Sequence, residues 1–109
     1  MWTIKGTPAT PDNTDVETDG KKRVVTFRLK AGAVKTLGRA PRADFILDVA
    51  LVSRLHCRLE AGDDTIDVID LSSTNGTYVN GKRVKRATLT IGDRLRVGRI
   101  ELTLDKAAH

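Results

Sequence analysis

The sequence predicts an all-β protein, an antiparallel β-sandwich or barrel built from many short strands. Apolar and polar residues alternate in short runs, which is the pattern of half-buried strands. Turn-forming residues separate these runs at short, regular intervals, as expected of an antiparallel sheet. Helical periodicity is nearly absent, and Pro41 interrupts residues 35–48, the segment where a small helix would otherwise fit.

The strands are expected to follow one another from the amino end. Residues 2–4 predict a short first strand, and residues 5–22, rich in Thr, Asp, Gly and Pro, predict an exposed polar loop. Asn80-Gly81 predicts a tight type I′ hairpin, because both central positions of that turn need φ > 0. The later strands alternate around these inward-facing residues: Val25, Phe27, Leu29; Leu37; Leu55, Cys57, Leu59; Leu95, Val97; Ile100, Leu102, Leu104.

Length and composition predict one soluble globular domain over residues 1–109, with 105–109 as a tail. No apolar run approaches the roughly 20 residues of a membrane span, and no secretory signal is visible. The single cysteine, Cys57, cannot form an internal disulfide. We therefore expect a cytoplasmic protein without membrane partners.

The net charge of +5 favours an anionic partner such as nucleic acid or a phosphorylated protein. Four aromatic residues are present, too few for an obvious platform on which bases would stack: Trp2, Phe27, Phe45 and Tyr78. Nucleic acid is therefore the weaker alternative, and steep salt dependence would be its sign.

Three separated segments carry side chains suited to binding an anion. Arg39, after Gly38 at the end of an alternating run, can present its planar guanidinium to a phosphate. The Ser53 hydroxyl can donate to a phosphate oxygen, and Thr74 can add a second hydroxyl. Asn75 carries both a donor and an acceptor, which suits gripping an extended peptide backbone. Plain alternatives exist for each, a solvated arginine or local turn residues, but they do not explain three such loops in one short chain.

The order of these motifs resembles the forkhead-associated (FHA) domain, a phosphothreonine-peptide reader. The motifs that carry the resemblance are Gly38-Arg39, Ser53-Arg54-Leu55-His56, Ser73-Thr74-Asn75-Gly76-Thr77-Tyr78-Val79-Asn80-Gly81 and Gly92-Asp93-Arg94-Leu95-Arg96-Val97-Gly98. The resemblance implies a sandwich of about eleven strands with the ligand held by loops at one apex. It also implies a non-catalytic signalling adaptor that binds a Ser/Thr-phosphorylated protein, and hence a Ser/Thr kinase upstream.

The resemblance further implies a role for each matching residue. The phosphate would be bound by Arg39 and Ser53, assisted at its rim by Arg54 and Thr74. The peptide backbone beside the phosphothreonine would be bound by Asn75. The loops would be held in place by Gly38, His56, Gly76 and Asn80.

An enzyme is the main alternative class, because Ser53, His56 and Asp70 are the ingredients of a hydrolase triad. However, no Gly-x-Ser-x-Gly elbow surrounds Ser53, and a serine three residues before its base on one strand is poorly placed for activation. His56 and Cys57 are adjacent, so on a strand they would point to opposite faces and not share a metal. We therefore predict no catalytic residues, no metal and no cofactor.

Two basic segments, residues 40–42 and 82–86, predict a preference for acidic residues after the phosphothreonine. A solvated basic turn without ligand contact explains them equally well. In the polar loop, Thr14 precedes acidic residues and is a candidate kinase target, although a plain polar loop is the favoured interpretation.

Overall fold

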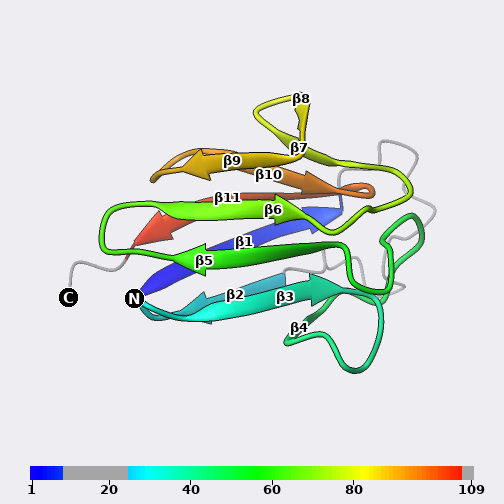
Figure 1. Ribbon diagram of the computed structural model, residues 1–109, viewed down its shortest axis with the longest axis horizontal. Helices are drawn as coiled ribbons and strands as arrows, with labels where there is room; N and C mark the ends of the chain where they lie inside the picture. Colours follow the sequence, from blue (N-terminus) through cyan, green and yellow to red (C-terminus); the bar gives the residue numbers. More distant parts are fainter. Residues whose placement is uncertain (9–24, 107–109) are drawn as a thin grey trace, which may run out of the picture.

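The computed structural model describes residues 1–8 and 25–106, which form two β-sheets packed face to face (Figure 1). This arrangement confirms the predicted all-β sandwich of eleven strands. The strands are β1 (Trp2–Pro8), β2 (Val25–Leu29), β3 (Val34–Gly38), β4 (Phe45–Ile46), β5 (Cys57–Ala61), β6 (Ile66–Asp70), β7 (Thr77–Val79), β8 (Lys82–Val84), β9 (Arg86–Leu89), β10 (Arg94–Val97) and β11 (Ile100–Lys106). No helix in these two ranges is long and apolar enough to cross a membrane.

The two sheets differ in size. The larger has six strands in the order β2-β1-β11-β10-β7-β8, and the smaller has five in the order β4-β3-β5-β6-β9. Every pairing is antiparallel except that of β3 with β4, which is parallel. The chain therefore crosses between the sheets several times, after β2, β6, β8 and β9.

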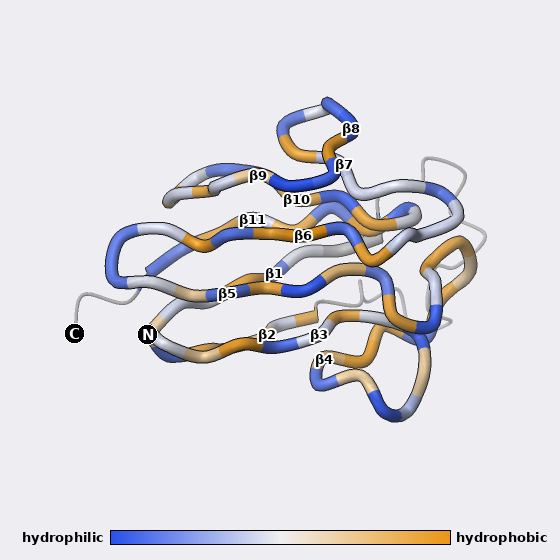
Figure 2. Tube along the Cα trace, in the orientation of Figure 1, coloured by the Kyte–Doolittle hydropathy of each residue, from blue (hydrophilic) through white to orange (hydrophobic). Residues whose placement is uncertain are grey.

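The core lies between the sheets because the alternating residues of each strand face inward. Figure 2 shows apolar and polar residues alternating along β5 and β6. Phe27 of the larger sheet and Phe45 of the smaller stack with ring centroids 4.6 Å apart, which ties the sheets together at one side. The largest fully buried apolar side chains are Trp2, Ile4, Leu37, Leu47, Leu59, Ile66, Leu89, Leu95, Leu102 and Leu104.

The first and last strands are longer than the sequence predicts. β1 continues through residues 5–8, assigned above to the polar loop, because it pairs with β11 along its whole length, from Trp2↔Lys106 to Pro8↔Ile100. For the same reason Asp105 and Lys106 belong to β11 and not to a tail. The rest of the predicted loop, with Thr14, lies outside the described residues, as do residues 107–109. A single domain over the whole chain stays a prediction.

The Asn80-Gly81 hairpin is confirmed. Asn80 has φ 50° and Gly81 has φ 87°, and the flanking residues Val79 and Lys82 face each other across β7 and β8. A two-residue turn with both φ angles positive matches the twist of the strands it joins.

One end of the sandwich gathers the three loops that carry the predicted site. The loop after β3, the loop before β5 and the loop after β6 lie at the same end (Figure 1). β5 begins at Cys57, so residues 53–56, predicted to open this strand, belong to the loop. We call this end the apex.

Candidate functional site

Arg39 lies just after β3 and is anchored to the loop that precedes β5. Its backbone N–H donates to the Ser53 carbonyl over 2.9 Å, and its Nε donates to the Val52 carbonyl over 3.1 Å. The residue is exposed. Since Nε is engaged, the terminal Nη1 and Nη2 atoms of the guanidinium are the donors left for a ligand.

Ser53 joins two of the predicted loops. Its Oγ accepts a hydrogen bond from the backbone N–H of Thr74 over 3.0 Å. A serine hydroxyl that accepts this bond keeps its own hydrogen to donate elsewhere. Arg39, Ser53 and Thr74, predicted from three separate motifs, are therefore brought together at the apex.

His56 is fully buried, and its ring forms hydrogen bonds to the loop before β5 and to the loop after β6. Its Nδ1 accepts from the Ser53 backbone N–H over 3.0 Å, and its Nε2 lies 2.8 Å from the Gly76 carbonyl. A carbonyl only accepts, so Nε2 carries the proton and the ring is neutral. Burial lowers the pKa of His56, outweighing the Gly76 contact and the charge of Asp70, which raise it. The predicted role of His56 in holding the loops agrees with this geometry.

Gly38 permits a close approach of backbones that no other residue allows. A Cβ built on Gly38 would lie 2.1 Å from the Arg54 carbonyl oxygen. The same carbonyl accepts from the Ala40 N–H over 3.0 Å, so the backbone of Arg54 is held against the end of β3 while its side chain is exposed. Gly38 thus allows the loop before β5 to lie against the end of β3.

Gly76 holds the loop after β6 in a turn. Its φ of 91° lies in the region that favours glycine, and its carbonyl accepts from His56. Asn75, just before it, is exposed and donates from Nδ2 to the Leu51 carbonyl over 3.2 Å. Asn75 therefore joins the loop before β5 to the loop after β6 at the rim of the apex.

Asn80 does not lie at the apex. It follows the other end of β7, where its Oδ1 accepts from the Arg94 N–H over 2.9 Å and its Nδ2 donates to Asp93 over 3.2 Å. It fixes the β7–β8 hairpin to the start of β10. The expectation that Asn80 holds the binding loops is corrected, because proximity to Asn75 in the motif does not mean proximity in space when a strand separates the two.

Three residues that sequence reasoning did not assign to the site shape the loop after β6. The Asp70 carboxylate accepts from the Ser73 N–H over 3.1 Å, from the Ser73 hydroxyl, and from Thr77 Oγ1 over 2.7 Å. The Ser73 oxygen accepts in turn from the Gly76 N–H over 3.0 Å. Partial burial would raise the pKa of Asp70, but the hydrogen bonds from Ser73 and Thr77 outweigh it and the pKa is lowered. The sequence pattern that could have indicated this role is an Asp three residues before a Ser at the start of a loop.

No catalytic triad is formed among Ser53, His56 and Asp70. Both ring nitrogens of His56 are engaged by backbone groups, and no described hydrogen bond joins the ring to the Ser53 hydroxyl or to the Asp70 carboxylate. Burial raises the pKa of the Cys57 thiol, so this cysteine stays protonated. Within residues 1–8 and 25–106, no group of three or more His, Cys, Asp or Glu residues is arranged to hold a metal ion.

A β-sandwich whose apical loops gather arginine, serine, threonine and asparagine has the fold and the side chains of a module that binds an anionic group such as a phosphate. The FHA domain family model matches residues 35–98, and the chain belongs to this family. FHA domains are phosphothreonine-dependent binding modules and not enzymes, which confirms the predicted functional class.

Known proteins support this assignment. The glycogen accumulation regulator GarA of Mycobacterium tuberculosis is 39% identical over 70 residues, which make up 64% of this chain and 43% of that protein. The oxoglutarate dehydrogenase inhibitor of Corynebacterium diphtheriae is 39% identical over 67 residues, 62% of this chain and 47% of that protein. The chain thus matches less than half the length of these relatives.

Solved structures agree with the fold. A structure from a structural and functional analysis of phosphothreonine-dependent FHA domain interactions superposes with a TM-score of 0.75 at 29% identity. The match covers 99% of this chain and 98% of the solved one. The similarity therefore extends over the whole sandwich.

Proposed function

We propose that this domain binds a phosphothreonine-containing segment of a Ser/Thr-phosphorylated partner protein at the apex. The observation that supports this most is the position of Ser53, whose carbonyl and hydroxyl oxygens accept from the backbone N–H groups of Arg39 and Thr74. Ser53 thereby holds the backbone of Arg39 and of Thr74 in place, and the side chains of both residues can donate to a phosphate.

The chemistry of the three side chains suits a phosphate. A phosphate on threonine carries about −1.5 to −2 charge and three acceptor oxygens at neutral pH. Arg39 offers its Nη donors, Ser53 and Thr74 offer hydroxyls, and the exposed Arg54 adds positive charge at the rim. Each hydrogen bond to a charged group contributes about 1.5–3 kcal/mol, so the set is consistent with roughly micromolar affinity after the cost of association.

Asn75 is proposed to bind the peptide backbone beside the phosphothreonine. Its Nδ2 group has two hydrogens, of which the Leu51 carbonyl takes one, so a donor and the Oδ1 acceptor remain. One donor and one acceptor on the same side chain match the N–H and C=O of a single peptide unit. Gly38, His56 and Gly76 would act indirectly by fixing the loops.

The partner is a phosphorylated protein, and a Ser/Thr kinase acts upstream of it. This proposal is supported by family membership and by the phosphothreonine dependence stated for the solved FHA structure above. A cytoplasmic adaptor in signalling is the role we infer. The activities named for the two longer relatives belong to those proteins.

A binding panel tests the proposed function. Fluorescence anisotropy would compare a phosphothreonine peptide, its unphosphorylated counterpart and a short single-stranded oligonucleotide. We expect roughly micromolar binding of the phosphopeptide and at least about tenfold weaker binding of its counterpart, since the charge-assisted bonds are lost. Equal affinity for both peptides would refute the proposal, and preferential, steeply salt-dependent binding of the oligonucleotide would favour a nucleic-acid function.

A further inference from the structure

Beside the apex, a row of basic and aromatic side chains crosses the larger sheet. Tyr78 of β7 faces Arg83 of β8 on one side and Arg96 of β10 on the other. Leu95 and Val97, the neighbours of Arg96 along β10, are fully buried. Because successive side chains of a strand point to opposite faces, Arg83, Tyr78 and Arg96 lie on the outer face of this sheet. We call these three residues the basic strip.

The strip concentrates positive charge on a short width of sheet. The Arg96 guanidinium lies 4.1 Å from the centre of the Tyr78 ring, in cation–π contact. Arg94 lies two residues from Arg96 on the same face. The carboxylate that faces this group is Glu101, which is opposite Arg96 in register and lies 4.0 Å from the Arg94 guanidinium. Among the described residues, Arg94 pairs with Glu101, and neither Arg83 nor Arg96 forms an ion pair.

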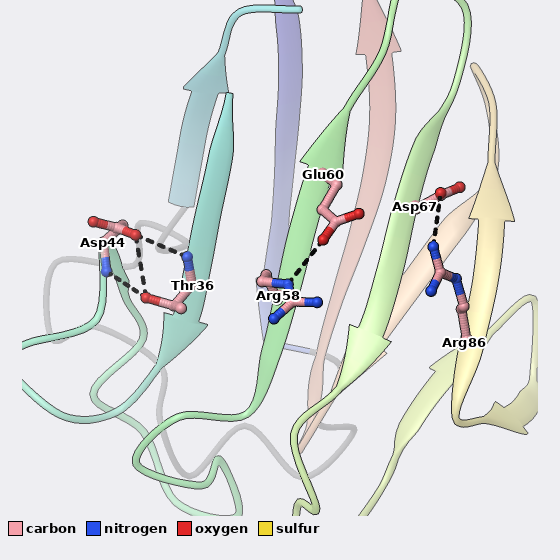
Figure 3. A network of polar contacts seen from close by, with 6 residues as sticks. All are labelled: Thr36, Asp44, Arg58, Glu60, Asp67 and Arg86. Carbon is pink, nitrogen blue, oxygen red and sulfur yellow. Dashed lines mark hydrogen bonds and ion pairs between the residues drawn. The ribbon is translucent and has the colours of Figure 1, made fainter. Parts of the chain in front are cut away.

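The outer face of the smaller sheet is different, because its arginines have acidic partners (Figure 3). Arg58 pairs with Glu60 at 3.0 Å, and Arg86 approaches Asp67 at 3.4 Å. Like charges close together on a sheet repel each other. The excess positive charge on the basic strip is therefore electrostatically unfavourable, and an anionic partner would reduce this repulsion.

The basic strip is continuous with the apex. A Cβ built on Gly76 would lie 2.6 Å from Nε of Arg83, so the Arg83 side chain is folded against Gly76. Gly76 directly follows Asn75, the residue proposed to bind the peptide backbone. A ligand chain that leaves Asn75 toward β8 would therefore meet Arg83 first.

We infer, on the basis of the proposed function, that the basic strip binds acidic side chains of the same phosphorylated segment. Asn75 and Tyr78 are three residues apart in the sequence, so their separation is at most about 10 Å at ~3.3 Å per residue. An extended ligand covers that distance in about three residues and needs about one to three more to reach from the phosphothreonine. The strip thus selects a partner with Asp or Glu about four to six residues from the phosphothreonine.

The test uses three phosphothreonine peptides with the same central residues. One has neutral flanks, one carries three Glu residues at positions four to six after the phosphothreonine, and one carries them at the same distance before it. Titration calorimetry at low and at physiological salt measures their affinities for the protein. We expect one of the acidic peptides to bind about three- to tenfold more tightly than the neutral one, and the difference to shrink at higher salt.

Variants of the strip test whether its arginines cause the tighter binding of the acidic peptide. Arg83→Gln and Arg96→Gln are expected to remove the advantage of the acidic peptide and to change the affinity for the neutral peptide less than about twofold. Arg28→Gln is the matched control, because Arg28 is an exposed arginine on the same sheet at the far strand, β2, and its loss changes the net charge equally. Thermal unfolding of each variant checks that the fold is kept, and Arg83→Lys, which retains the charge, should keep most of the advantage.

The outcomes separate this inference from the proposed function. If the neutral phosphopeptide binds and neither acidic peptide binds more tightly, the inference is wrong while the proposed function stands. If no phosphopeptide binds, the proposed function itself fails. If an oligonucleotide of matched charge binds more tightly than the acidic peptides and loses affinity in Arg83→Gln, the strip serves nucleic acid and the inference is overturned.

Discussion

The backbone N–H of Thr74 donates to Oγ of Ser53 over 3.0 Å, although 21 residues separate the two in the sequence. This bond closes the apex, because it joins the loop before β5 to the loop after β6. His56 supports it from below by accepting from the Ser53 N–H and contacting the Gly76 carbonyl. The side chains proposed to bind phosphate therefore depend on a network of backbone contacts for their positions.

Replacing Ser53 tests both this network and the proposed contact of Ser53 with the phosphate. Ser53→Ala removes the acceptor for the Thr74 N–H and a hydroxyl proposed to donate to the phosphate. We expect the Kd for a phosphothreonine peptide to rise about tenfold, equivalent to about 1.4 kcal/mol, in titration calorimetry. Thr26→Ala, at an exposed position of β2, is the control and should bind like the parent. A Kd that Ser53→Ala leaves unchanged would remove Ser53 from the site.

Gly38→Ala is expected to destabilise the protein and weaken binding. The added methyl group would meet the Arg54 carbonyl oxygen at 2.1 Å, so the backbone must move. We expect a loss of about 1–3 kcal/mol in the free energy of urea-induced unfolding. Gly62→Ala provides the comparison, since its nearest contact would be 3.3 Å, and it should lose less. Equal losses for the two variants would argue against a special role of Gly38.

His56 predicts a dependence of stability on pH. Its pKa is lowered in the folded state from 6.5, so the unfolded chain binds more protons when the pH falls through that value. The stability is therefore complete above about pH 7 and declines as the pH falls below 6.5, by up to about 1.4 kcal/mol per pH unit.

Urea unfolding at pH 7.5, 6.5 and 5.5 would measure this decline. His109→Gln, which removes the other histidine of the chain, should keep the slope, whereas His56→Gln should flatten it. A free energy of unfolding that does not change over this range would contradict the buried, neutral state of His56.

Asp70→Asn is expected to loosen the loop after β6. The carboxylate accepts from Ser73 and Thr77, and the carboxamide has one acceptor oxygen in place of two. We expect a loss of about 2 kcal/mol in the free energy of unfolding and weaker phosphopeptide binding, because Ser73 also orients the Gly76 N–H. Asp64→Asn, in an exposed turn, should leave both unchanged. Stability equal to that of the parent protein would show that Asp70 does not shape the loop.

The fold was largely predictable because alternation of apolar residues is a local signal. The inward-facing residues of β2, β5, β10 and β11 agree with the sequence pattern. The length of β1 was not predictable, because Lys5 to Pro8 has the composition of a loop and becomes a strand through pairing with β11. Tertiary pairing decided the conformation of that segment.

The site was predictable in part. Arg39, Ser53 and Thr74 were each visible as donors, but their meeting at one apex was implied by the family resemblance and by no local pattern. Asp70 was missed as a support of the loop because its role depends on how residues 71–77 turn back on its carboxylate. Asn80 was misplaced because a sequence motif does not show at which end of a short strand each residue lies.

The most direct test of the account is the contribution of Arg39 to phosphopeptide affinity. Arg42→Ala is the matched control, because Arg42 is an exposed arginine in the same loop after β3. In titration calorimetry with a phosphothreonine peptide whose flanking residues are neutral, Arg39→Ala should bind about 30-fold more weakly than the parent protein, a loss of about 2 kcal/mol, and Arg42→Ala within about twofold. If Arg39→Ala and the parent protein bind the phosphopeptide equally well, the apex is not the phosphate-binding site.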